Sequence, residues 1–259
     1  MCELLAMSSR LPTNVNHSLL EFARHGGETG PHADGWGIAY AMGGDFRIIK
    51  EPQPAADSDC VRYIQAHHFS SRLVISHIRK ASLPRTLSFE NTHPFDRELF
   101  GRRFLFAHNG HLPGIDTLAA GAPPRFLPLG ETDSERAFCL ILNRLAQRAG
   151  RPEDYRPRLL LDVLTELSPH LRALGKCNFL LSDTEYLIAH GDTSLHSVTR
   201  TCTVETQALA SADLRISMTH HTPQVASVVA TVPLTAEAGW RAFAPGEIRV
   251  FSAGSQVTP

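Results

Sequence analysis

A cysteine at position 2 has both the residue type and the position to do covalent chemistry. Removal of the initiator methionine, which a small second residue permits, would give Cys2 a thiol and a free α-amine. A thiol with an ordinary pKa of about 8.5 is mostly protonated at neutral pH, whereas an α-amine with a pKa of about 7.7 to 8.0 is partly free base and could accept its proton. Cys2 could therefore act as a nucleophile that supplies its own base. The alternative is a small apolar residue that begins a strand.

Polar residues that could bind a small charged substrate lie in five short clusters between apolar segments. The clusters are GPHADGWG at 30–37, SHIRKAS at 76–82, NTHPF at 91–95, FAHNG ending at position 110, and GETDSE at 130–135. Arg79 offers a planar fork of donors that suits a carboxylate, and Asp133 offers a carboxylate that suits an ammonium group. Each has a structural alternative, because Arg79 could form a surface ion pair and Asp133 could stabilise a helix N-terminus.

Asn109 and Gly110 could place an amide side chain and a backbone N–H at a developing oxyanion. Asn-Gly is also a common tight-turn dipeptide, so a turn after a strand is the alternative. Trp36, which lies between two glycines, could pass close to the site or pack in the core. The clusters also hold three histidines that could shape a pocket, although we favour structural over catalytic roles for them: His77, His93 and His108.

The histidine content does not by itself indicate a metal site. Of the 14 histidines, neighbouring pairs occur at 67–68 and 220–221, but no H-E-x-x-H or comparable ligand spacing is present. We therefore predict that the protein uses no metal and no cofactor.

The apolar patterns predict strands on both sides of a helical pair. Strands are expected at 3–8, 36–41, 46–51, 72–79 and 104–109, and from positions 178, 186, 225 and 247. Gly43-Gly44 should form a hairpin turn, and Pro245-Gly246 should lead into the last strand. The alternation over 72–79 places Arg79 at a strand end.

Two helices should follow one another in the middle of the chain. Thr132 is the expected N-cap of the first, with Glu135 returning the hydrogen bond as a reciprocal pair. Its apolar residues recur at helical spacing and should be buried: Phe138, Ile141, Leu142 and Leu145. The second helix should run from about 158 to 174, with Pro169 breaking or kinking it and Gly175 ending it. This order predicts an α+β fold, and we expect a single domain over residues 1–259.

Composition excludes several classes of protein. The chain has 25 Lys and Arg against 26 Asp and Glu, a formal net charge of −1, with 42% hydrophobic and 20% charged residues. It is thus expected to be globular and to bind neither nucleic acid nor an anionic membrane. Five cysteines without C-x-x-C spacing indicate neither a disulfide framework nor a zinc site. With no apolar run of about 18 residues, we expect a cytoplasmic protein.

Cys2 and the five clusters together resemble the class-II glutamine amidotransferases, the N-terminal nucleophile hydrolases that begin with a catalytic cysteine. More narrowly, MCELLAMSS, GETGPHADGWG, ENTHPF and GETDSE are similar to the stand-alone YafJ-type proteins. The resemblance extends to VATVPLT and PGEIRVF near the C-terminus. Its motifs are weak one by one, and they gain specificity from their number and their order.

This resemblance implies a four-layer αββα sandwich and a role for each candidate residue. Cys2 would be the nucleophile, and Asn109 with Gly110 would form the oxyanion hole at the sheet ends, where Cys2 meets the Asn109 turn. The substrate would be bound by residues of the other clusters: Arg79 at its α-carboxylate, Asp133 at its α-ammonium group, and Trp36, His93 and His108 around it.

The implied reaction is release of ammonia from the side-chain amide of glutamine through a γ-glutamyl thioester. Larger family members fuse this domain to a synthase that consumes ammonia, so a separate synthase is the partner expected here. Two alternatives remain open at this point. The protein could hydrolyse a γ-glutamyl amide other than glutamine, or it could be a non-catalytic module that binds an amino acid.

Overall fold

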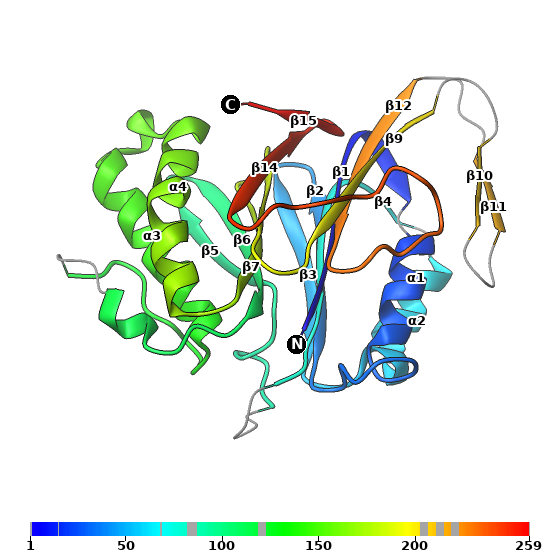
Figure 1. Cartoon of the computed structure of the whole chain (residues 1–259), viewed down its shortest axis with the longest axis horizontal. Coiled ribbons are helices and arrows are strands. Elements are labelled where there is room, and N and C mark those ends of the chain that lie inside the picture. The colour runs from blue at the N-terminus through cyan, green and yellow to red at the C-terminus, as the bar shows by residue number, and fades with distance from the viewer. Residues whose placement is uncertain are drawn as a thin grey trace.

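The computed structural model places two antiparallel sheets face to face (Figure 1). It describes residues 2–14, 16–67, 69–81, 87–118, 123–202, 207–210, 215–218 and 223–258. The seven-stranded sheet has the spatial order β13 (Arg241–Ala242), β9 (His196–Cys202), β12 (Gln224–Ala230), β1 (Glu3–Asn14), β4 (Ser70–Ile78), β2 (Trp36–Met42), β3 (Asp45–Glu51). The six-stranded sheet has the order β15 (Ser255–Val257), β14 (Glu247–Ser252), β8 (Leu187–Gly191), β7 (Cys177–Ser182), β6 (Arg102–Gly110), β5 (Phe95–Leu99).

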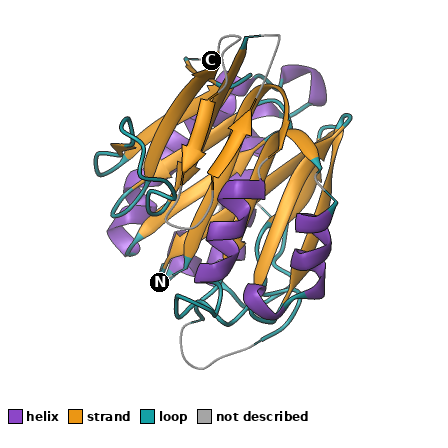
Figure 2. Ribbon diagram, turned by 90° about the vertical axis from the view of Figure 1, so that its right-hand side faces the viewer, coloured by secondary structure: helices purple, strands orange, loops and turns teal. Residues whose placement is uncertain are grey.

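Helices cover the outer face of each sheet. Helices α1 (Asn16–His25) and α2 (Asp59–Ala66) lie on the seven-stranded sheet, and α3 (Asp133–Ala149) and α4 (Pro157–Leu174) lie on the six-stranded sheet. Figure 2, viewed from the side of α1 and α2, shows helices in front of the strands. The described residues also form the ribbon β10 (Gln207–Ala210) with β11 (Arg215–Met218), and three short 3-10 helices: Ala55–Asp57, Ile115–Leu118 and Pro152–Asp154. The expected four-layer αββα fold is confirmed.

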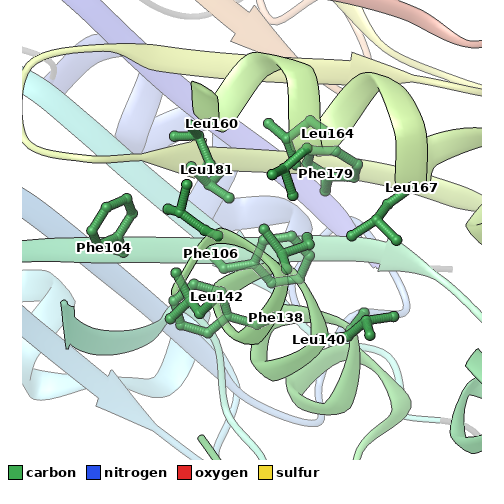
Figure 3. Close-up of a cluster of buried hydrophobic side chains, with 14 of the residues drawn as sticks. Phe104, Phe106, Phe138, Leu140, Leu142, Leu160, Leu164, Leu167, Phe179 and Leu181 are labelled. Carbon is green, nitrogen blue, oxygen red and sulfur yellow. The ribbon is translucent and has the colours of Figure 1, made fainter. Parts of the chain in front are cut away.

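The period of two along each strand divides the apolar residues among three cores. In β1, Leu4 and Ala6 point between the sheets, whereas Leu5 and Met7 point towards α1 and α2. The third core lies between the six-stranded sheet and the helices α3 and α4 (Figure 3). There the rings of Phe106 and Phe138 stack with centroids 5.3 Å apart. Burial of each side chain of this size stabilises the fold by about 1.5 to 3 kcal/mol. The burial energy therefore determines which face of each strand points into a core.

The predicted elements that carry the site are present. The strands expected at 36–41, 72–79 and 104–109 are β2, β4 and β6, and Arg79 directly follows the end of β4. The Gly43-Gly44 hairpin joins β2 to β3 as expected, with Gly43 at a φ of 66°. The strands expected from 178, 186, 225 and 247 are likewise present, as β7, β8, β12 and β14.

Helices α1 and α2 were not expected from the sequence. They have only 10 and 8 residues, so neither shows the long helical periodicity that marks α3 and α4. The expected order of strands, two helices and strands was therefore incomplete. None of the described helices has the length and apolar character that crossing a membrane requires.

Two expectations about the long helices were wrong in part. Helix α4 continues through Pro169, which lies on the exposed side while Leu164 and Leu167 hold the opposite side in the core. The hydroxyl of Thr132 does cap α3 by accepting the N–H of Glu135 at 3.2 Å. The Glu135 carboxylate, however, accepts hydrogen bonds from the preceding loop and pairs with Arg97 at 2.5 Å. It stabilises the loop before the helix, in place of the predicted reciprocal pair.

Candidate active site

Strand pairing brings Cys2 and Arg79 to one edge of the seven-stranded sheet. Strands β1 and β4 are antiparallel neighbours, with Glu3 opposite Ile78. Cys2 precedes the first residue of this register and Arg79 follows the last. The two residues are 77 positions apart in the sequence, and they meet because both lie one step beyond the same pair.

The loop after β4 is held by the segment that precedes β2. Arg79 donates its backbone N–H to Gly35 at 2.7 Å and accepts the N–H of Asp34 at 3.0 Å. The carboxylate of Asp34 accepts the N–H of Ala81 at 2.9 Å. Burial lowers the pKa of Arg79 below its ordinary value, but an arginine keeps its charge at neutral pH. The geometry therefore presents a fixed, buried cation beside Cys2.

The thiol of Cys2 lies against the backbone of this loop. Its Sγ is 3.4 Å from the backbone N of Lys80 and 3.5 Å from the backbone O of the same residue. Burial raises the pKa of the thiol, and this effect exceeds the opposing effects of the Lys80 hydrogen bond and the charge of Arg79. Among the described residues, no titratable side chain forms a hydrogen bond with Sγ. The described hydrogen bonds of the thiol are thus made with the protein backbone.

Asn109 and Gly110 approach this edge from the other sheet. They are the last two residues of β6, where they pair with Asn178 and Cys177 of β7. Asn109 therefore lies in a strand and not in the expected turn. Asn109 is fully buried, and its Nδ2 lies 3.5 Å from the hydroxyl of Thr231, which also accepts the N–H of Leu4 at 2.9 Å. This hydroxyl links the end of β6 to the strand that begins behind Cys2.

Gly110 is required by the close approach of another segment. A Cβ at this position would lie 1.8 Å from the backbone O of Lys176 and 2.6 Å from Nε2 of His108. The same Lys176 oxygen accepts the N–H of His111 at 3.0 Å. The glycine is therefore explained by tight packing between the end of β6 and the start of β7, and not by a turn.

Asp133 is the first residue of α3 and faces the end of β6. Its Oδ2 accepts the N–H of Leu112 at 2.6 Å and lies 3.1 Å from Nδ1 of His111. The side chain of Asp133 is 23% exposed, so a cation could still reach it from solvent. The structure is compatible with both roles considered for Asp133. It lies at a helix N-terminus, which its charge stabilises, and it also borders the site, where it could bind an ammonium group.

A hollow of about 340 Å³ brings most of the predicted residues together. Its lining residues are Cys2, Arg79, Lys80, Ala81, Asn91, His93, His108, Gly110, His111, Glu131, Thr132, Asp133 and Ser134. Arg79 supplies positive charge and Asp133 negative charge beside the Cys2 thiol. Such a hollow suits a small zwitterion.

Trp36 is placed elsewhere. Its side chain is 2% exposed, packs in the core under α1 and α2, and donates its indole N–H to Glu51 at 2.9 Å. It is not among the residues that line the hollow, so the expected contact with a substrate has no support in this geometry. Its neighbour Gly37 does permit a close approach, since a Cβ there would lie 2.1 Å from the backbone O of His93.

The motif histidines form a buried, neutral group beside the hollow. The rings of His77 and His93 stack with centroids 4.1 Å apart, and their nitrogens have no hydrogen-bond partner among the described residues. His108 lies 2.8 Å from the hydroxyl of Ser134 through Nδ1. Burial lowers the pKa of His77 to about 3, that of His108 to about 4, and that of His93 well below its ordinary value. These imidazoles are uncharged at neutral pH.

Sequence reasoning missed several residues of the site. Asp34 and Lys80 lie within the recognised clusters, so the clusters could have directed attention to them. Lys176 follows the glycine that ends α4, and nothing in the local sequence connects it with Cys2. In the part of the chain that the structure describes, no three His, Cys, Asp or Glu side chains gather as metal ligands. His68 and the pair at 220–221 lie outside that part.

Comparison with known proteins identifies the family of this chain. A family model described as class-II glutamine amidotransferases matches residues 1–259. The chain belongs to this family. Within the family, it is 40% identical over 259 residues to a protein of Escherichia coli K12 that is named YafJ and assigned by that name to the glutamine amidotransferases. The match covers 99% of this chain and 100% of YafJ.

Further relatives agree with the family and with the fold. A protein of Haemophilus influenzae, also named as a glutamine amidotransferase, is 33% identical over 261 residues, covering 99% of this chain and 86% of that protein. The crystal structure of a predicted glutamine amidotransferase from Pseudomonas aeruginosa PA01 is 34% identical, with a TM-score of 0.76 over the whole of both chains. The glutamine phosphoribosylpyrophosphate amidotransferase of Bacillus subtilis shares the fold at 18% identity and a TM-score of 0.61, over 99% of this chain and 48% of that chain.

Proposed function

We propose that this class-II amidotransferase family member hydrolyses the side-chain amide of glutamine, with Cys2 as its nucleophile. The observation that carries the proposal is the placement of Cys2 in one hollow with Arg79, Gly110 and Asp133. A thiol, a backbone N–H donor and two fixed opposite charges are the groups that a glutamine amide hydrolase needs.

The base is the α-amine that Cys2 would gain on removal of Met1. Burial keeps the thiol protonated, and its described hydrogen bonds are to the backbone of Lys80. The neighbouring imidazoles are neutral and could in principle accept a proton. Among the described residues, however, none of them forms a hydrogen bond with Sγ. An amine on the same residue needs no further element to position it.

The reaction then proceeds in two steps. The α-amine accepts the thiol proton, Sγ attacks the γ-carbonyl carbon, and the amide nitrogen leaves as ammonia with that proton, giving a γ-glutamyl thioester. Water, deprotonated by the same amine, cleaves the thioester to glutamate and regenerates the thiol. The N–H of Gly110, which lines the hollow, is the proposed donor to the oxyanion, worth about 3 kcal/mol of transition-state stabilisation. Asn109 is the proposed second donor, and its buried Nδ2 would have to turn from the hydroxyl of Thr231 towards the hollow to act in this way.

The charged residues of the hollow explain selection of an amino acid. Arg79 would bind the α-carboxylate and Asp133 the α-ammonium group, so an amide that lacks either charge would lose one of these two charged contacts. His93 and His108, which line the same hollow, would contact the substrate only as neutral groups. Ammonia released here would be consumed by a separate synthase, which is the proposed partner in the cytoplasm.

The decisive experiment compares Cys2→Ser with the unmodified chain. We expect glutamate release from glutamine to fall by more than about a thousandfold, because the serine hydroxyl is a far weaker nucleophile with this base. Cys60→Ser, at a half-buried cysteine of α2 outside the hollow, is the matched control and should keep the activity. An unchanged rate in Cys2→Ser would refute the mechanism.

Intact-mass analysis tests whether Met1 is removed, which is the condition for Cys2 to have the free α-amine proposed as the base. Labelling with a glutamine-like diazoketone should add one adduct at Cys2, on a chain that has lost Met1. A chain that keeps Met1, or that fails to react at Cys2, would favour the non-catalytic amino-acid-binding module instead.

A further inference from the structure

The hydroxyl of Thr231 connects the strand behind Cys2 with the end of β6. Its Oγ1 accepts the N–H of Leu4 at 2.9 Å and lies 3.5 Å from Nδ2 of Asn109. Thr231 is the first residue after β12, and its own N–H donates to the backbone O of Leu4 at 3.0 Å. One side chain thus contacts both the segment that carries the proposed nucleophile and the proposed second donor to the oxyanion.

The position of this hydroxyl is fixed by the residues around Thr231. Its backbone O accepts a hydrogen bond from the hydroxyl of Ser194 at 3.0 Å and lies 3.1 Å from Nδ1 of His196. The residue is 7% exposed, and a β-branched side chain has little freedom at χ1. The hydroxyl is therefore held in place before any substrate binds.

The main chain of Asn109 is fixed as well. It lies opposite Asn178 in the pairing of β6 with β7, and its backbone O accepts the Nδ2 of Asn178 at 3.1 Å. The fully buried side chain keeps one soft rotation, about the Cβ–Cγ bond. A half-turn about this bond exchanges the amide O and N, which are nearly equal in size, so both orientations fit the same space.

The hydrogen bonds of the present orientation are incomplete. A threonine hydroxyl can accept two hydrogen bonds and donate one. Among the described residues, the hydroxyl of Thr231 accepts from Leu4 and, at the limiting distance of 3.5 Å, from Asn109, while its proton has no acceptor. Oδ1 of Asn109 is buried and has no partner among the described residues either. A donor and an acceptor on these two neighbouring side chains are thus both unpaired, which costs free energy in a buried place.

Resting on the proposed function, we propose that Thr231 is a positioning residue of the oxyanion hole, whose hydroxyl donates to Oδ1 of Asn109 and thereby directs Nδ2 to the oxyanion formed at Cys2. The half-turn pairs the hydroxyl proton with Oδ1 and frees both protons of Nδ2. Because an O–H···O bond is about 2.8 Å long, the amide also moves closer to Thr231. The negative oxygen of the transition state supplies the partner for Nδ2, so this orientation is favoured most when the oxyanion forms.

Thr231→Val removes the hydroxyl at a similar side-chain volume. We expect kcat for glutamine hydrolysis to fall about tenfold or more with little change in KM, because the hydroxyl supports a bond made only in the transition state. Thr231→Ser keeps the hydroxyl and should recover most of this kcat. Thr13→Val is the matched control, since Thr13 is similarly buried at the far end of β1 and its hydroxyl accepts a hydrogen bond from Gln224. It should keep the kcat of the unmodified chain.

A double variant shows whether Thr231 acts through Asn109. Asn109→Ala should lower kcat about a hundredfold, as expected for the loss of one oxyanion donor. Adding Thr231→Val to Asn109→Ala should then cause no further decrease, because the amide that the hydroxyl directs is already absent. A general disturbance of the fold by Thr231→Val would lower kcat in both backgrounds.

A crystal structure with an aldehyde analogue of glutamine tests the geometry in the unmodified protein. Sγ adds to the aldehyde carbon and the thiol proton passes to the aldehyde oxygen, so this oxygen lies where the oxyanion would form. One amide atom of Asn109 should lie within about 3.2 Å of it, and the other within about 3.2 Å of Oγ1 of Thr231. Thr231→Val also leaves the N–H of Leu4 without its acceptor, and this measurement decides the proposal even if that variant does not fold.

The outcomes separate the inference from the proposed function. Suppose that hydrolysis depends on Cys2. The inference is then wrong if Thr231→Val keeps the full kcat, if it lowers kcat equally in the Asn109→Ala background, or if Asn109 does not contact the aldehyde oxygen. The role of Cys2 stands in each of these cases. If glutamine hydrolysis does not depend on Cys2, both the proposed function and the inference are wrong.

Discussion

At the scale of residues, the candidate site combines the proposed nucleophile Cys2 with neighbours that are held by backbone contacts. Cys2 touches the backbone of Lys80, Arg79 is tied to Gly35 and Asp34, and Gly110 admits a carbonyl oxygen. The chemistry proposed for Cys2 depends on distances that its neighbours fix through their main chains. Substitutions that move these main chains should therefore affect the site more than the loss of a side chain nearby.

Gly110→Ala tests this view. The new Cβ would collide with the backbone O of Lys176 at 1.8 Å, and because a backbone atom cannot rotate away, β6 and β7 must separate. We expect the free energy of unfolding to fall by about 1 to 3 kcal/mol, measured by urea denaturation, with loss of activity. Gly44→Ala is the control, since nothing lies within 4 Å of a Cβ there. Equal stability of the two variants would contradict the packing explanation.

At the scale of elements, α3 carries the proposed binding residue Asp133 on its first turn. Thr132 caps the helix through its hydroxyl, Asp133 follows as the first helical residue, and Glu135 accepts N–H bonds from Leu129 and Gly130. The loop before α3 and the start of the helix are thus held as one unit against the end of β6. The position of Asp133 depends on this unit.

Thr132→Ala should separate stability from binding. Loss of the cap costs about 1 kcal/mol of unfolding free energy and frays the turn that holds Asp133, so KM should rise more than kcat falls. The matched control is Ser58→Ala, which removes the equivalent cap of α2, where the hydroxyl accepts the N–H of Val61. Urea denaturation should show a loss at least as large in the control, because the Ser58 hydroxyl also donates a hydrogen bond to Glu51, while its KM should be unchanged. A similar KM in both variants would argue against a role of α3 in binding.

At the scale of the whole molecule, the layered fold buries neutral histidines at the point where the two sheets and α3 meet. The unfolded chain would protonate these groups near pH 6.5, whereas burial holds the pKa of His77 at about 3 and that of His108 at about 4 in the folded state. Protons therefore bind the unfolded state preferentially between about pH 6.5 and 4. Stability should fall as the pH is lowered through this range.

The His77→Phe variant measures this contribution. Phenylalanine keeps an aromatic ring against His93 but cannot take up a proton, so the loss of unfolding free energy between pH 7 and pH 5 should shrink by about 2 kcal/mol. His25, whose pKa is raised by its hydrogen bond to Glu3, acts in the opposite direction and is present in both proteins. His67→Gln, at an exposed histidine after α2, is the control. An unchanged pH dependence in His77→Phe would disprove the effect.

The sequence by itself determined the features that depend on neighbours in the chain. Alternation along β4 placed Arg79 at a strand end, the i, i+3, i+4 spacing of α3 gave its buried side, and Thr132 was identified as its cap. These patterns arise from periods of 2 and 3.6 residues and from local hydrogen bonds, which a linear sequence displays directly. The short helices α1 and α2 were not predicted, because two or three turns are too short to show a clear helical period.

The tertiary structure alone decided which of these residues meet. Strand register placed Cys2 beside Lys80, 78 positions away, and sheet stacking brought Gly110 to the same edge. It also directed Trp36 into the core and brought the backbone of Lys176 against Gly110. Contacts of this kind are set by the pairing and burial of whole strands and layers, whose energies are summed over distant segments. No local stretch of the sequence encodes them.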